Sequence, residues 1–315
     1  MATIAADEIA SVSLNDAERD RDGFAQKLGR SFEDYGFAII GDHGIPDELI
    51  ERAEEKARAF FALPDEVKQK YFIAGGGGAR GYTPFGIETA KGHNAHDLKE
   101  FWHVGRDLPP RHKFSSHMPG NVWPSEVPSF KDTFTELYAT FYRTGLKILR
   151  AIARYLKIEE DYFIDTVRDG NSVMRLLHYP PIEDEPGSHV RAGAHEDINT
   201  ITLLLGAEEA GLELLTKDGR WIPVSPKPGE LVVNIGDMLQ RLTNGQLRST
   251  SHRVVNPPRE RWGKSRYSMP FFLHFRSDFL IEALPGTVPS GEQPKWPPIT
   301  ADEYLQERLR EIKLV

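Results

Sequence analysis

The chain has 315 residues of ordinary globular composition, with 39% hydrophobic and 27% charged side chains. Its formal net charge of -8 leaves no basic excess to neutralise phosphates, so we expect no nucleic-acid partner. It contains no cysteine, which excludes disulfides, iron–sulfur clusters and thiolate zinc sites. The N-terminal segment does not read as a signal peptide, and no run approaches a membrane span. We therefore expect a cytoplasmic protein without a membrane partner, whose oligomeric state the sequence does not indicate.

The first half of the chain is predicted to be mainly helical. Residues 22–35 and 47–63 carry apolar side chains at helical spacing, and a short apolar strand at 36–40 lies between them. Residues 75–86, GGGGARGYTPFG, are predicted to form a Gly-rich loop, either a mobile surface loop or a lid over a site. The loop lacks the Lys-Ser/Thr ending of a phosphate-binding loop. Residues 127–156 predict one long helix or two helices end to end.

From about residue 171 the pattern changes to short, β-rich runs separated by Gly, Pro, Asn and Asp. The runs are SVMRLLHYPP, NTITLLL, LELLT, WIPV, ELVVNIGDMLQRLT, HRVV and RYSMPFFLHF. Their number predicts an antiparallel barrel or jelly roll. Thr300 and Glu303 have capping-box spacing before a C-terminal helix, whose stripe of Leu305, Leu309 and Ile312 packs on the core or on another subunit. We expect an α+β fold with helices around a β core.

Residues 193–205, GAHEDINTITLLL, place His195 and Asp197 one residue apart before an apolar run. If a strand begins there, both side chains point to the same side, because side chains alternate along a strand. Without cysteine a metal site must use nitrogen and oxygen ligands, and His252 at the start of HRVV is a third candidate. Two histidines and a carboxylate are the ligand set of non-haem Fe(II) oxygenases. The His-x-Asp pair alone is equally consistent with a polar cluster, and His252 favours the metal site.

Arg266 and Ser268 begin the run RYSMPFFLHF. A guanidinium on the inner face of a core strand is costly unless it is paired, and a neighbouring hydroxyl suits a carboxylate. The pair therefore predicts a bound anion close to the metal, unless Arg266 faces outward from an edge strand. Tyr179 in LLHYPP is a candidate third contact to that anion or a core tyrosine before a Pro turn.

Three residues are candidate contacts for a small-molecule substrate: Arg175, Phe272 and His274. Alternation along the strand places Phe272 and His274 on the face of Arg266, and places Arg175 on the face of Tyr179. Arg175 either holds an anionic group of the substrate or forms a structural ion pair. These residue types do not identify the substrate.

The motifs resemble the isopenicillin N synthase-like branch of the Fe(II)/2-oxoglutarate-dependent dioxygenases over nearly the whole chain. The similar segments, in family order, are GFAIIGDHGIPDELIERAEEKARAFFALPDEVKQKY, GYTPFGIETAKGHNAHDLKEFWHVGR, MRLLHYPP, AHEDINTITLLL, PGELVVNIGDMLQRLTNGQLRSTSHRVVNP and RYSMPFF. The resemblance implies an Fe(II) ion with three ligands: His195, Asp197 and His252. It implies that 2-oxoglutarate, the cosubstrate, is held by Arg266 and Ser268 with Tyr179 nearby.

The resemblance also implies a double-stranded β-helix, or jelly roll, within a single oxygenase domain over residues 1–315. Its expected parts are an N-terminal helical, substrate-covering region (1–110), a helical segment (111–165), the jelly-roll core with the iron site (166–285) and a C-terminal helix (286–315). Two positions depart from the family pattern. Leu177 stands where many plant members have Asn, so cosubstrate contacts at that corner are expected to differ. Glu196 stands where Thr is common and is expected to point away from the metal.

The activity that the resemblance implies is oxidation of a small molecule by O2, above all hydroxylation, with release of succinate and CO2. A 2-oxoglutarate-independent iron oxidase and an ethylene/succinate-forming enzyme are alternatives within the family, because relatives use a similar Arg/Ser pair for a substrate carboxylate. A non-catalytic ligand-binding barrel would leave three potential metal ligands without a purpose. A zinc hydrolase would leave the Arg266 and Ser268 pair unexplained.

Overall fold

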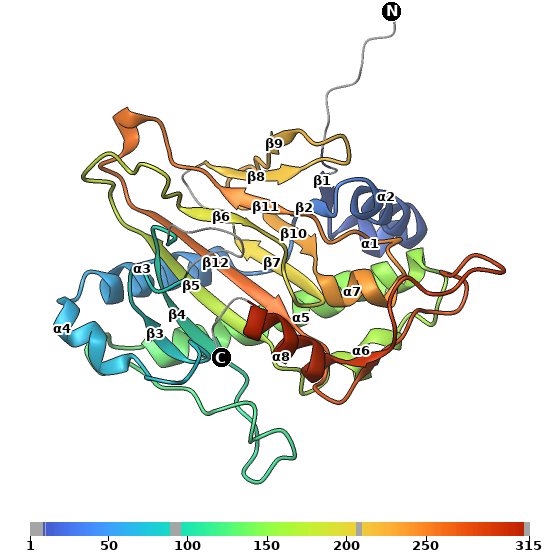
Figure 1. Cartoon of the computed structure of the whole chain (residues 1–315), viewed down its shortest axis with the longest axis horizontal. Helices are drawn as coiled ribbons and strands as arrows, with labels where there is room; N and C mark the ends of the chain where they lie inside the picture. Colours follow the sequence, from blue (N-terminus) through green and yellow to red (C-terminus); the bar gives the residue numbers. More distant parts are fainter. Residues whose placement is uncertain (1–8, 10, 89–95, 206–209, 312–315) are drawn as a thin grey trace, which may run out of the picture.

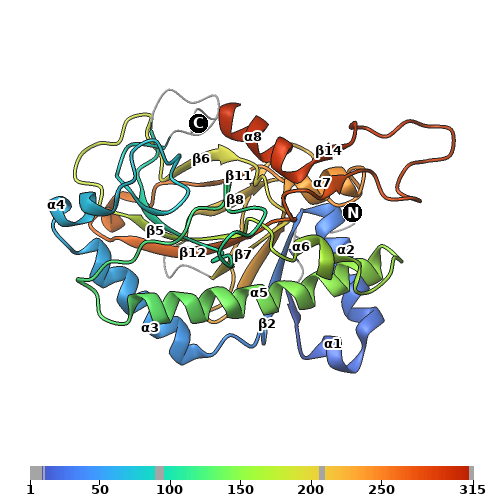
Figure 2. The same cartoon turned by 90° about the horizontal axis from the view of Figure 1, so that it is seen from below.

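Two β-sheets face each other at the centre of the structure, and helices cover the outer face of the larger sheet (Figures 1 and 2). The computed structural model describes residues 9, 11–88, 96–205 and 210–311. The larger sheet has the order β1 (Ser11–Ser13), β2 (Phe37–Gly41), β10 (Leu231–Ile235), β7 (Ile201–Leu205), β12 (Arg266–Leu273), β5 (Val173–Tyr179), β4 (Glu100–Gly105) and β3 (Gly81–Thr83). The smaller sheet has the order β6 (Ala192–His195), β11 (His252–Val254), β8 (Leu212–Leu215) and β9 (Trp221–Pro223). A further pair joins β13 (Leu280–Ile281) to β14 (Ile299–Thr300).

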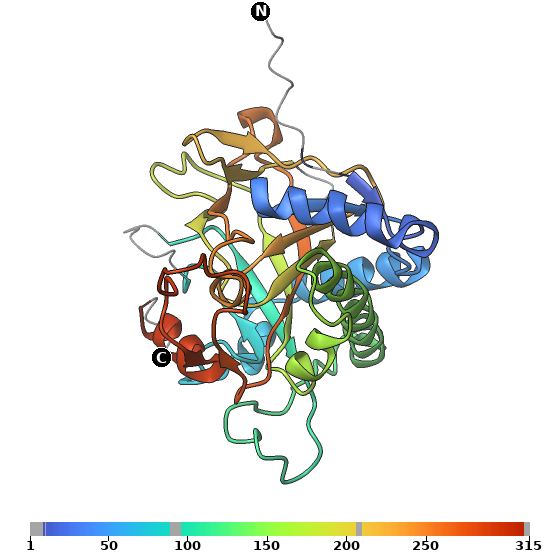
Figure 3. The same cartoon turned by 90° about the vertical axis from the view of Figure 1, so that its right-hand side faces the viewer.

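The helices lie mostly on one side of the larger sheet. They are α1 (Asp16–Arg19), α2 (Arg21–Asp34), α3 (Asp47–Phe61), α4 (Asp65–Lys68), α5 (Phe130–Tyr155), α6 (Tyr162–Val167), α7 (Asp237–Leu242) and α8 (Ala301–Glu311), with 3-10 turns at Gln69–Tyr71 and Arg259–Arg261. Figure 3 shows α2 and α5 on the opposite side of the sheets from α8. Within the described part of the chain, every helix is too short or too polar to cross a membrane.

The outer face of the larger sheet packs on α5 and forms one apolar core. Phe271 of β12 stacks on Phe141 of α5 with a ring-centroid distance of 5.4 Å, and Tyr138 contacts the same ring edge-on at 5.0 Å. Gly145 allows the close approach of α5, because a Cβ there would lie 2.5 Å from Leu273 Cδ1. Burying such aromatic and aliphatic side chains is the main stabilising term of the fold.

The inner face of the same strands carries the residues expected at the site. Phe271 packs outward, so its neighbour Phe272 faces the smaller sheet. Arg266 is paired in register with Tyr179, and Ser268 with Leu177, so these four residues share that inner face. A smaller apolar cluster between the two sheets contains Leu177 and Tyr179. The jelly-roll core therefore presents a polar row inside an otherwise apolar interior.

The structure confirms most of the predicted elements. The helices expected at 22–35, 47–63 and 127–156 are α2, α3 and α5, and α5 is one continuous helix. The capping box is present, because Glu303 N–H donates to Thr300 Oγ1 at 3.3 Å and Thr300 N–H donates to Glu303 Oε2 at 3.0 Å. Of the predicted stripe on the C-terminal helix, Ile312 lies outside the described residues.

Other segments correct the sequence expectations. In the run ELVVNIGDMLQRLT the strand β10 stops at Ile235, and the remainder forms the helix α7. Met238, Leu239 and Leu242 are buried along that helix, so its apolar residues follow helical spacing rather than strand alternation. The segment expected to be only a Gly-rich loop contains the strand β3, and β4 is a strand that the sequence pattern does not predict.

Candidate active site

His195, Asp197 and His252 meet at the edge of the smaller sheet. One potential ligand atom from each lies within 4.8 Å of the others. His195 is the last residue of β6, and His252 is the first of β11, directly opposite in the antiparallel register. Asp197 lies in the connection to β7, not in a strand. The predicted convergence is therefore correct, although it comes from a turn and a strand pair rather than from alternation along one strand.

The two histidines are oriented by backbone carbonyls. His195 Nδ1 lies 2.8 Å from Gly193 O, and His252 Nδ1 lies 3.0 Å from Thr250 O. With each Nδ1–H donating to a carbonyl, both Nε2 atoms are left as lone-pair donors. They lie 3.9 Å (His195) and 3.8 Å (His252) from Asp197 Oδ1. Three such atoms around one point fit a divalent metal ion bound on one face, with further positions open.

The second oxygen of Asp197 is held by the larger sheet. Asp197 Oδ2 accepts hydrogen bonds from Thr202 Oγ1 at 2.5 Å and from Asn234 Nδ2 at 2.8 Å. The main chain is fixed as well, because Asp237 N–H donates to Asp197 O at 2.7 Å. Thr202 and Asn234 are opposite each other on β7 and β10. The carboxylate is thus fixed with Oδ1 toward the histidines.

Electrostatics keep His195 and Asp197 in the protonation states that metal binding requires. Burial, and then the neighbouring His252, lowers the pKa of His195 to about 4, so the imidazole is neutral near pH 7. Burial alone would raise the pKa of Asp197, but the two histidines and the Asn234 and Thr202 hydrogen bonds hold it below its ordinary value. A neutral imidazole and an ionised carboxylate are the forms that ligate metals.

The three residues expected to bind a carboxylate are together on the inner face. Arg266 and Ser268 are buried on β12, and Arg266 Nη1 donates to Ser268 Oγ at 3.3 Å. The Arg266 guanidinium lies over the ring of Tyr179, with Cζ 5.1 Å from the ring centroid. Because β12 lies between β7 and β5, the alternative of an outward-facing arginine in an edge strand is wrong. The role of these residues in binding 2-oxoglutarate remains a prediction.

A cavity of about 560 Å³ opens beside the triad. His195 and Asp197 line it, and so do all three candidate substrate residues, Arg175, Phe272 and His274. Burial lowers the pKa of His274 to about 4, so this imidazole is also neutral near pH 7. A volume of this size suits a small organic molecule.

Three further segments contribute to the cavity wall. Gly77 and Gly78 of the Gly-rich loop line it, as do Leu305 and Leu309 of α8. The predicted stripe of α8 therefore faces this cavity within the chain. Glu196 is outside the metal-ligating cluster, as expected, but its side chain lines the cavity. The Gly-rich loop thus contributes to the cavity wall, and the expectation that it acts as a lid stays a prediction.

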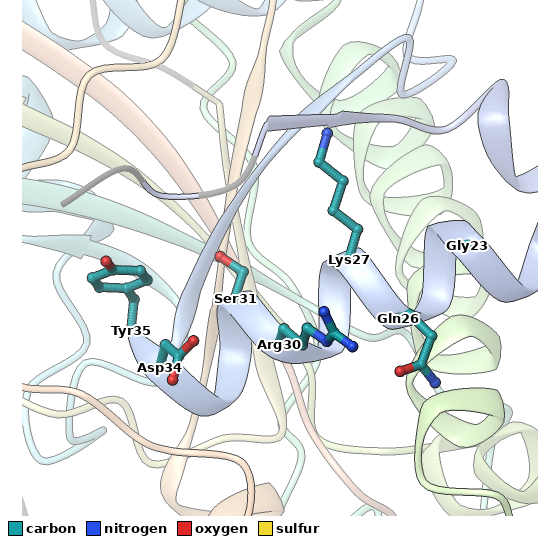
Figure 4. A pocket seen from close by; sticks show the side chains of 7 residues that line it. All are labelled: Gly23, Gln26, Lys27, Arg30, Ser31, Asp34 and Tyr35. Atoms are coloured by element: carbon teal, nitrogen blue, oxygen red, sulfur yellow. The ribbon is translucent and has the colours of Figure 1, made fainter. Parts of the chain in front are cut away.

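A second hollow, of about 400 Å³, lies along α2 and is remote from this chemistry (Figure 4). Its lining residues come from α2 and from Tyr35 directly after it. Lys27 points away from Arg30 and Asp34 and donates to Ser11 O at 2.9 Å. The hollow contains none of the potential metal ligands described above.

Comparisons with known families agree with this geometry. Residues 8–126 match the family described as the N-terminal region of non-haem dioxygenases in morphine synthesis. Residues 170–275 match the 2OG-Fe(II) oxygenase superfamily and include all three triad residues. A 2-oxoglutarate-Fe(II) type oxidoreductase of Emericella nidulans is 35% identical over 291 residues, covering 89% of this chain and 82% of that protein. Flavanone 3-dioxygenase 2 of Oryza sativa subsp. japonica is 35% identical over 257 residues, covering 81% of this chain and 72% of that protein.

Solved structures show the same fold. A protein assigned to the 2OG-Fe(II) oxygenase family from Caulobacter crescentus is 58% identical, with a TM-score of 0.90 over 96% of this chain and 99% of that chain. A full-length Neurospora crassa protein in complex with alpha-KG is 28% identical, with a TM-score of 0.87 over 97% of this chain and 98% of that chain. The same Neurospora crassa protein with alpha-KG and thymine is 29% identical with a TM-score of 0.86, covering 98% of each chain. With its triad, its jelly-roll core and these matches, the chain belongs to the isopenicillin N synthase-like 2-oxoglutarate- and Fe(II)-dependent dioxygenases.

Proposed function

We propose that the protein hydroxylates a small organic molecule, converting C–H to C–OH while O2 and 2-oxoglutarate are consumed and succinate and CO2 are released. The observation that carries the proposal is the cavity in which His195 and Asp197 form one wall and aromatic and polar side chains form the others. Bound Fe(II) with 2-oxoglutarate supplies the oxidising chemistry. The chain supplies the geometry that places a substrate C–H bond beside it.

The residues divide into three groups by role. His195, Asp197 and His252 hold the iron through two Nε2 atoms and Asp197 Oδ1. We assign the distal carboxylate of 2-oxoglutarate to Arg266 and Ser268, because a guanidinium fork next to a hydroxyl matches a carboxylate. Tyr179 supports that fork through its ring.

We place the substrate in the cavity between β12 and the Gly-rich loop. Phe272 offers an apolar face, and the neutral imidazole of His274 can donate one hydrogen bond and accept another. Arg175 lies next to Phe272 on the same inner face, with its guanidinium 4.1 Å from the Phe101 ring centroid and 5.5 Å from the Phe272 ring centroid. The Neurospora crassa structure with thymine supports a substrate of this size, because that relative holds a small ring compound together with alpha-KG.

The test is an anaerobic optical titration of metal-free protein with Fe(II) and then with 2-oxoglutarate. A weak visible absorption band that requires both additions is expected, followed by succinate release when O2 is admitted with a substrate. The His252→Ala variant should show no band. Iron binding without any effect of 2-oxoglutarate would overturn the proposal in favour of a 2-oxoglutarate-independent oxidase. Ethylene in the headspace would identify the ethylene-forming alternative.

A further inference from the structure

A buried cluster of charged side chains forms one wall of the cavity. Glu88 is at its centre, with its carboxylate 2.6 Å from Lys99 Nζ. The same carboxylate accepts hydrogen bonds from Arg175 Nη1 at 3.2 Å and from Arg175 Nη2 at 3.3 Å. Lys99 also donates to Asp97 Oδ2 at 2.8 Å. Both cations that face the cavity here are therefore already occupied by carboxylates of the chain.

The wall formed by Glu88, Asp97, Lys99 and Arg175 carries no net charge, because two carboxylates balance two cations. Burial alone would raise the pKa of Glu88, but Arg175 and Lys99 hold it well below its ordinary value. Burial alone would lower the pKa of Lys99, but Glu88 and Asp97 raise it above its ordinary value. Glu88 and Lys99 thus stay ionised near pH 7, and all four groups are paired, as buried charges require.

The rest of the wall adds hydrogen-bonding groups without charge. Arg175 Nε donates to His103 Nε2 at 2.6 Å, and His103 Nδ1 lies 2.5 Å from Gly78 O. This arrangement makes His103 a neutral imidazole. Burial and the neighbouring Arg175 also lower its pKa, which favours the same neutral form. His274, which also lines the cavity, is neutral, and Asn171 lines it as well, although its Oδ1 has no partner among the described residues and essentially no accessible surface. Neutral donors and acceptors of this kind suit an uncharged polar ligand.

Among the described residues of the cavity wall, Arg80 is the other buried cation, and it is closed off from a ligand. Its Nη1 donates to Ala79 O at 2.7 Å, and its Nε and Nη2 have essentially no accessible surface. The guanidinium packs flat on Gly105, where an added Cβ would lie 1.8 Å from Arg80 Cζ. At the opposite side, Arg308 of α8 is paired with Glu311 at 2.6 Å. Arg80 Nε and Nη2 and Arg308 Nε have no hydrogen-bond partner among the described residues, but they also have essentially no accessible surface, so a carboxylate in the cavity does not reach them.

We propose that Glu88 determines substrate charge: by occupying Arg175 and Lys99, it makes the cavity accept uncharged polar molecules, such as amides and lactam-like rings, and reject carboxylates. The inference rests on the proposed function, because it takes this cavity to be the substrate site. Glu88 is a specificity residue in this account and takes no part in the oxidation itself.

The same contacts connect the substrate wall to the iron site. Asp97 Oδ1 accepts a hydrogen bond from Gly193 N–H at 2.9 Å, and Gly193 O orients His195. Changing Asp97 would therefore disturb the metal site as well as the wall. Glu88 is one contact further away, so it can be changed with the smallest effect on the iron ligands.

The experiment measures binding of matched neutral and anionic probes to the anaerobic Fe(II)–2-oxoglutarate protein by calorimetry. Benzamide is compared with benzoate, and phenylacetamide with phenylacetate, with 2-oxoglutarate saturating so that its own site is filled. The wild type should bind each amide at least about tenfold more tightly than its acid. Glu88→Gln keeps the shape of the side chain but leaves one cation uncompensated, so the preference should shift toward the acids by about tenfold to a hundredfold.

The double variant Glu88→Gln/Arg175→Gln is the matched control, because it removes one charge of each sign and restores a neutral wall. Its preference should return to the amides, whereas a merely structural role for Glu88 would leave the double variant no closer to wild type. Tighter binding of the acids by wild type, no measurable binding of either amide, or an unchanged ratio in a folded Glu88→Gln protein would each overturn the proposal. The titration is repeated on metal-free protein, because the charge of the wall does not depend on iron. The preference for amides should persist there even if the proposed function fails, so the two failures are distinguishable.

Discussion

Replacing Thr202 with valine tests whether the hydrogen bonds to Asp197 prepare that carboxylate for iron. The substitution keeps the side-chain shape and removes the donor 2.5 Å from Asp197 Oδ2, leaving only the 2.8 Å bond from Asn234. Both donors lower the pKa of Asp197, so losing one strengthens the competition of protons with the metal. Loss of a partner to a metal ligand typically lowers metal affinity by about 10- to 100-fold. That range corresponds to about 1.4–2.7 kcal/mol, within the range for a hydrogen bond to a charged group.

The assay is competitive titration of Fe(II) under anaerobic conditions, with folding checked by thermal unfolding. Thr200→Val is the matched control, because Thr200 is fully buried two residues away and its Oγ1 has no partner among the described residues. It should bind iron like wild type. Equal iron affinity for Thr202→Val and Thr200→Val would show that the turn alone positions Asp197. Equal losses in both variants would instead indicate a general packing defect.

Three further predictions concern the cosubstrate and the fold. Arg266→Ala should raise the 2-oxoglutarate concentration needed for half-maximal succinate release by about 100-fold, and Ser268→Ala by about tenfold, because a charge-assisted pair is lost in the first and one hydroxyl in the second. A larger effect of Ser268→Ala would reverse the assigned roles. Gly145→Ala should lower the free energy of unfolding by about 1–3 kcal/mol through overpacking, whereas Gly120→Ala, with no atom within 4 Å of the added Cβ, should not. Thr300→Ala should cost about 1 kcal/mol in denaturant unfolding through loss of the capping box, and an unchanged midpoint would contradict that role.

The sequence predicts those parts of the site whose geometry is local. Alternation places Arg266 and Ser268 on one face, and the register with Tyr179 and Leu177 bears this out. The metal ligands converge for a partly different reason, because Asp197 lies in a turn and not in the expected strand. Residue type and spacing are sufficient to predict these ligands, because the side chains of a His-x-Asp pair can converge whether the pair lies in a strand or in a turn.

The parts that the sequence does not predict depend on contacts between distant segments. Glu88 and Arg175 are 87 residues apart, and neither lies in a pattern that indicates the other. Lys99 is charged and precedes the unpredicted strand β4, so local hydropathy favours a loop. The helix α7 is not predicted because a short apolar run is compatible with either periodicity, and packing against the Asp197 turn decides between them.

One row of the larger sheet connects metal binding to substrate shape. Asn234, Thr202, Phe272 and Val173 are successive register partners across β10, β7, β12 and β5, and therefore face the cavity side at the same level. The first two residues hold Asp197, whereas Phe272 and Val173 line the cavity. Changes of size at Phe272 or Val173 can alter the substrate without removing a hydrogen bond from Asp197. The same fold can thus keep its iron chemistry while its substrate changes, which is how one site geometry serves relatives with different substrates.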